Sequence, residues 1–73
     1  MKGKNTFTAS EAARILRLLR SKERAERDEQ KQLRSQLRQR HGFYITDFPG
    51  TRRPFRAQDF NHLVRSGRIT LRG

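Results

Sequence analysis

The sequence predicts a small α+β domain in which two amino-terminal helices, able to form a hairpin, and one further helix pack on a two-stranded sheet. Three patterns predict the amino-terminal helices and the two strands. Apolar residues recur at three-and-four spacing before residue 40, a β-favouring run occupies 43–46, and residues 68–72 alternate polar and apolar. Between the two expected strands a second apolar set follows helical spacing, which predicts the further helix.

The chain has 73 residues and no internal repeat or low-complexity linker, which predicts one domain over 1–73. Its expected parts are a helical pair over about 8–40 and a strand–loop–helix–strand unit over about 43–72. A chain of this size buries only about 60% of the surface that its unfolded form exposes. A large enclosed active-site cavity is therefore not expected.

The first helix is expected to begin at Thr8, because Thr8-Ala9-Ser10-Glu11 has the form of a capping box. In that motif the Thr8 hydroxyl accepts from the Glu11 N–H, and the Glu11 carboxylate reaches back to the Thr8 N–H. The apolar face that follows consists of Ala12, Ile15, Leu16 and Leu19.

A second helix is expected over about 22–40, although residues 21–32 contain a single apolar residue, Ala25. Ion pairs four residues apart are expected to hold this stretch. The candidates are Glu23–Arg27, Lys22–Glu26 and Arg24–Asp28. Whether the two helices are continuous stays open, because neither Gly nor Pro forces a turn near Ser21. A hairpin would bring Leu16 and Leu19 to Leu33 or Leu37.

The carboxy-terminal half is expected to begin with a strand at 43–46, followed by a turn and a loop. The last helix has one apolar face and should end before Gly67. That face consists of Ala57, Phe60, Leu63 and Val64. The second strand, 68–72, is expected to direct Ile69 and Leu71 inward.

Most aromatic residues are expected in the core, because a short chain without Trp has few other large apolar groups. This expectation covers Phe43, Phe48, Phe55 and Phe60. Tyr44 is the exception, because alternation along the strand turns it to the opposite face. Aromatic residues among arginines can form a stacking platform for single strands.

The chain carries 18 Lys and Arg against 7 Asp and Glu, a formal charge of +11. Residues 34–73 hold nine arginines and two aspartates, so most of the excess lies there. A guanidinium pairs bidentately with phosphate and with guanine edges. These counts predict a nucleic-acid partner, DNA or RNA; an acidic protein surface, or charge that serves solubility alone, is the alternative.

Phosphate contacts are expected from arginines on the second helix and before the last one. These are Arg34, Arg38, Arg52, Arg53 and Arg56. Arg34 and Arg38 form a basic stripe with Lys31 on the second helix, and Arg40 and His41 extend this stripe at the end of the helix. The helix dipole alone would favour cations at this end, but Lys31 and Arg34 lie too far back for it to help.

The solvent face of the last helix carries the side chains of a major-groove reader. They are Gln58, Asn61, His62 and Arg65. Gln and Asn can pair with adenine, Arg can bind guanine, and His can donate to a base or a phosphate. There are two alternatives to base reading. The simpler one is an ordinary solvated face, and the other is a face that contacts phosphates without reading bases.

The sequence does not favour an enzyme, a cofactor or a metal site. His41 and His62 could in principle cleave RNA as base and acid, but their spacing does not support this role. No close set of His and carboxylates suits a metal ion, and without Cys there is no thiolate ligand or disulfide. No apolar run reaches the length of a membrane span, so no membrane partner is expected. A cytoplasmic location, with the nucleoid or with ribonucleoproteins, fits this composition.

Residues 7–16, Phe-Thr-Ala-Ser-Glu-Ala-Ala-Arg-Ile-Leu, resemble the opening helix of excisionase-like and MerR-like winged-helix DNA-binding domains. In those families a tight turn and a recognition helix follow. Here a charged stretch of about a dozen residues follows, so the resemblance assigns no functional residue and no family.

The sequence thus predicts a small basic nucleic-acid-binding accessory protein that contacts the phosphate backbone through arginines. The alternative is an interaction module that docks on an acidic protein partner, and a small RNase ranks below both. Sequence preference, the choice between DNA and RNA, the oligomeric state and the biological process stay open at this stage.

Overall fold

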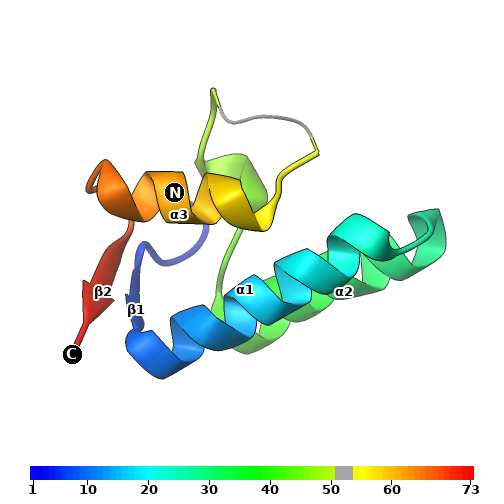
Figure 1. Ribbon diagram of the computed structural model, residues 1–73, viewed down its shortest axis with the longest axis horizontal. Helices are drawn as coiled ribbons and strands as arrows, with labels where there is room; N and C mark the ends of the chain where they lie inside the picture. The colour runs from blue at the N-terminus through cyan, green and yellow to red at the C-terminus, as the bar shows by residue number, and fades with distance from the viewer. Residues whose placement is uncertain (51–53) are drawn as a thin grey trace.

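The computed structural model describes residues 1–50 and 54–73 and has the predicted α+β architecture (Figure 1). The elements are β1 (Thr6–Thr8), α1 (Ala9–Arg24), α2 (Arg27–His41), a 3-10 turn (Ile45–Asp47), α3 (Ala57–Arg65) and β2 (Thr70–Arg72). Helices α1 and α2 lie side by side as a hairpin, α3 packs against α1, and the two strands pair beside α1. Within the described ranges no helix has the length and apolar character that crossing a membrane requires.

Helix α1 begins where the sequence predicts, but only half of the capping box forms. Thr8 is the N-cap, and its Oγ1 accepts from the Glu11 N–H at 3.1 Å. The Glu11 carboxylate does not turn back to Thr8. It lies 3.5 Å from Lys4 Nζ and 3.4 Å from His41 Nδ1, and so joins the start of α1 to the end of α2.

The two helices are separate, and the break falls at Ala25 and Glu26, later than the expected start of the second helix near residue 22. Both residues have extended backbone, and Gln30 Nε2 donates to the Ala25 carbonyl at 3.0 Å. The hairpin buries Leu19 and Leu37 completely, as its apolar pattern requires. The ion pairs expected between residues 22 and 28 do not form, because each candidate pair straddles the break.

The strand expected at 43–46 was a wrong prediction. The sheet partner of β2 is β1, which pairs with it in parallel, with Thr6 opposite Thr70 and Phe7 opposite Leu71. Residues 43–48 instead bend through the 3-10 turn, which lets Phe43 and Phe48 stack with ring centroids 5.7 Å apart. A regular strand continued through 43–48 would direct these two positions, five apart, to opposite faces and could not bury both rings together.

The core is an aromatic cluster between the hairpin and α3. Phe43 is fully buried, and its ring centroid lies 5.5–6.0 Å from those of four other phenylalanines. These are Phe7, Phe48, Phe55 and Phe60. The four phenylalanines expected in the core are therefore all buried. Phe7 joins them because it lies on β1.

Helix α3 has the predicted orientation, with Ala57, Phe60 and Leu63 buried and Val64 partly buried. The last turn of α1 fixes its start, because Glu23 Oε2 accepts from the Ala57 N–H at 3.2 Å. In β2 the sequence pattern is only half right. Ile69, just before β2, is 1% exposed, but Leu71 is 41% exposed, because β2 is a three-residue strand whose one partner among the described residues is β1.

Candidate nucleic-acid interface

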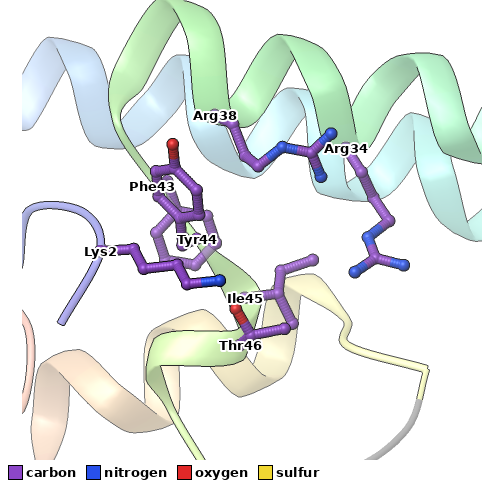
Figure 2. Close-up of a pocket in the computed structure, with 7 residues that line it drawn as sticks. All are labelled: Lys2, Arg34, Arg38, Phe43, Tyr44, Ile45 and Thr46. Carbon is purple, nitrogen blue, oxygen red and sulfur yellow. The ribbon is translucent and has the colours of Figure 1, made fainter.

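A basic hollow of about 270 Å³ lies between α2 and the segment that follows it. Its lining combines three cations with an aromatic and aliphatic wall: Lys2, Arg34, Arg38, Phe43, Tyr44, Ile45 and Thr46. Figure 2 shows Arg34 and Arg38 leaving the same side of α2 while Lys2 approaches from the amino-terminal segment. Tyr44 and Ile45 lie between these cations.

A second hollow, of about 470 Å³, continues the first toward the start of α2, because Arg34 and Ile45 line both. Its other lining residues are Lys22, Arg27, Gln30, Lys31, Pro54 and Phe55. We call the two hollows together the α2 groove. Six Lys or Arg residues line the groove, and none of its described lining residues carries a carboxylate.

The cationic wall of the α2 groove follows from residue spacing on one helix. Arg27, Lys31, Arg34 and Arg38 are separated by four, three and four residues, which places them in a single row on α2. At about 1.5 Å per residue, the row is about 16 Å long. Such like-charged neighbours weaken an isolated helix by a few tenths of a kcal/mol per pair. The row of like charges therefore lowers the intrinsic stability of α2.

Asp47 places Lys2 at the groove. Its carboxylate oxygens accept from the backbone N–H groups of Lys2 and Gly3, each at 2.8 Å. The bond from the Lys2 N–H is the largest of the effects that lower the pKa of Asp47, so this carboxylate stays ionised at neutral pH. A Cβ at Gly3 would lie 2.6 Å from the Tyr44 ring and closer still to the Gly42 carbonyl oxygen. Only glycine allows the segment to lie this close to Tyr44.

Lys22 holds in place Phe55, which lines the α2 groove on the side that faces α2. Its side chain is 6% exposed, and Nζ donates to the Phe55 carbonyl oxygen at 3.4 Å. Burial is the main cause of its lowered pKa, and the nearby charge of Arg34 lowers it further. Together with Glu23 on the Ala57 N–H, this contact ties α1 to the chain entering α3.

Of the arginines expected at phosphates, the structure brings Arg34 and Arg38 into the α2 groove. Arg56 is exposed at the start of α3, while Arg52 and Arg53 lie outside the described residues. Arg27 extends the row by one turn beyond Lys31 and was not predicted at the site. Lys2 and Lys22 were not predicted there either, because tertiary contacts and no local pattern bring them to the groove.

The base-reading residues expected on α3 lie on a different surface. Gln58, His62 and Arg65 line a shallow hollow of about 800 Å³ together with Asp59 and Arg68, and none of these residues lines the α2 groove. Asn61 is exposed but does not line this hollow. Asp59 also accepts from the Arg56 N–H at 2.9 Å. This surface, unlike the groove, therefore includes a carboxylate.

The structure does not bring two imidazoles to one site. His41 is buried beside Glu11, whereas His62 is exposed on α3. Among the described residues no group of His, Cys, Asp or Glu could hold a metal ion. Comparison of the chain with protein-family models, curated proteins and solved structures finds no match.

Proposed function

We propose that this chain is a small basic nucleic-acid-binding accessory protein that contacts the phosphate backbone through α2. The observation that carries the proposal is the lining of the α2 groove, where six cations meet no carboxylate among the described residues. A protein that needed charge for solubility alone would gain more from interspersed signs. A location with the nucleoid or with ribonucleoproteins would follow from this function.

A polyanion would stabilise the row of cations that weakens α2 on its own. Each phosphate that a Lys or Arg neutralises releases condensed counterions, and this release drives association at moderate salt. Arg34 and Arg38 can also bind phosphate oxygens bidentately. The proposal therefore assigns backbone contact to the groove and leaves Gln58, Asn61, His62 and Arg65 as a second, independent candidate surface.

The salt dependence of binding tests this proposal. Arg34→Ala/Arg38→Ala should weaken binding to every sequence and flatten the log–log salt slope by about 0.7 to 0.9 per lost contact. Arg14→Ala/Arg72→Ala is the matched control, since it removes the same charge from exposed positions outside the groove and outside the basic stripe. Fluorescence anisotropy at several salt concentrations measures both effects. Equal slopes for the two double variants would remove the groove from the interface.

A second candidate function, docking on an acidic protein, is favoured by the outer side of α1. There Arg17, Arg20 and Arg24 surround the partly buried Leu16 in a hollow of about 420 Å³. Anisotropy that shows no salt-dependent affinity for DNA or RNA, together with an acidic protein captured through Arg17 and Arg20, would favour this alternative over the groove.

A further inference from the structure

We infer that the α2 groove is built for single-stranded nucleic acid, with phosphates on its cationic wall and bases on its apolar wall. This inference rests on the proposed function and names the substrate class of the same site. The two walls differ in chemistry. The helix side carries Arg27, Lys31, Arg34 and Arg38, and the facing side carries Tyr44, Ile45, Pro54 and Phe55.

This division matches a single strand better than a duplex. An unpaired strand exposes charge along one edge and flat apolar bases along the other. A duplex presents phosphates on its outside and keeps its bases stacked within, so its bases cannot reach a recessed ring. At about 270 Å³ the hollow around Tyr44 lies just below the range of about 300 to 1,000 Å³ typical of small-ligand pockets. That volume suits one base or nucleotide.

Tyr44 is the residue expected to stack. All five phenylalanines are buried in the core, whereas Tyr44 is partly exposed and lines the hollow beside Lys2 and Arg38. Base stacking on an aromatic side chain tolerates any sequence, because every base has a π-face. The Asp47 contacts and Gly3 hold the adjoining segment against this ring, so the platform is formed before ligand arrives.

The chain supplies its own probe for this contact. Tyr44 is the single tyrosine and there is no Trp, so tyrosine emission reports on this ring alone. Single-stranded DNA and RNA oligonucleotides should quench the emission at saturation, after correction with free tyrosine amide for absorbance by the bases. An abasic sugar-phosphate oligomer of equal length should bind with the same salt slope but without quenching.

Variants at Tyr44 complete the test. Tyr44→Ala should weaken binding to single strands about 5- to 150-fold, whereas Tyr44→Phe should stay within about twofold and the affinity for duplex should not change. Thermal unfolding of both variants checks that the fold is kept.

Wild-type protein that shows no quenching at saturation, or a folded Tyr44→Ala with unchanged affinity for single strands, would overturn the inference. In that case the slope change of Arg34→Ala/Arg38→Ala would still support the proposed function. Absence of any salt-dependent binding would defeat both.

Discussion

Asp47 illustrates how one acidic residue can serve a basic surface. Its two carboxylate oxygens accept from consecutive backbone N–H groups, and the side chain of Lys2 thereby reaches the α2 groove. The negative charge of Asp47 repels a phosphate in the α2 groove. Its hydrogen bonds have the opposite effect, because they position Lys2, which attracts the phosphate. Single substitutions would mix these two effects.

A double-mutant cycle separates positioning from charge. Lys2→Ala should weaken nucleic-acid binding and flatten the salt slope by about 0.7 to 0.9 in the wild-type background. In an Asp47→Ala background, where the segment is no longer held, the same Lys2→Ala change should have little further effect. Anisotropy titrations of the four proteins give the coupling. If Lys2→Ala costs the same in both backgrounds, Asp47 does not position Lys2.

At the scale of elements, helix α3 depends on a single inward face. Phe60 is 1% exposed, and its ring centroid lies 6.3 Å from that of Phe7 and 5.5 Å from that of Phe43. Truncation of such a ring leaves a cavity in the middle of the cluster. On the opposite face of the same helix, Asn61, His62 and Arg65 are exposed.

We therefore expect Phe60→Ala to cost about 3 to 5 kcal/mol, most or all of the stability of a domain of this size. Arg65→Ala, on the exposed face, should stay within about 0.5 kcal/mol. Thermal and urea unfolding followed by circular dichroism compare the two variants. If α3 also reads bases, Arg65→Ala would reduce discrimination at one base pair by about 1 to 3 kcal/mol. A well-folded Phe60→Ala would contradict the arrangement of the core.

The start and the orientation of a helix could be predicted where the signal lies in the helix's own residues. Thr8 marks the start of α1, and the period of Ala57, Phe60 and Leu63 sets the orientation of α3. The break at Ala25 was misplaced because charged helix formers give no local signal for a turn. The strand at 43–46 was wrong because burial of both Phe43 and Phe48 outweighs the β-propensity of the residues between them.

At the scale of the whole molecule, the groove was predictable only along α2. Lys31, Arg34 and Arg38 follow from helical spacing, and Tyr44 was singled out for its apparent position on a strand that does not exist. It remains partly exposed for a different reason, because the 3-10 turn places it beside α2. Lys2 and Lys22 depend on Asp47 and on the Phe55 carbonyl, partners 45 and 33 residues away in sequence.

The parallel sheet joins Thr6 to Thr70, across almost the whole chain. Closing a loop of that length costs an unstructured chain about 4 kcal/mol of entropy, more than three residue pairs can recover when all three of their β2 members are exposed. We therefore expect the sheet to form after the core, and β2 to detach from β1 while Phe7 stays packed. We expect the Thr70 amide, which donates to the Asn5 carbonyl at 2.8 Å, to exchange with solvent far faster than the amides of Ile15 and Leu19. Native-state hydrogen exchange measures this difference, and equal protection would mean that the strands and the core open only together.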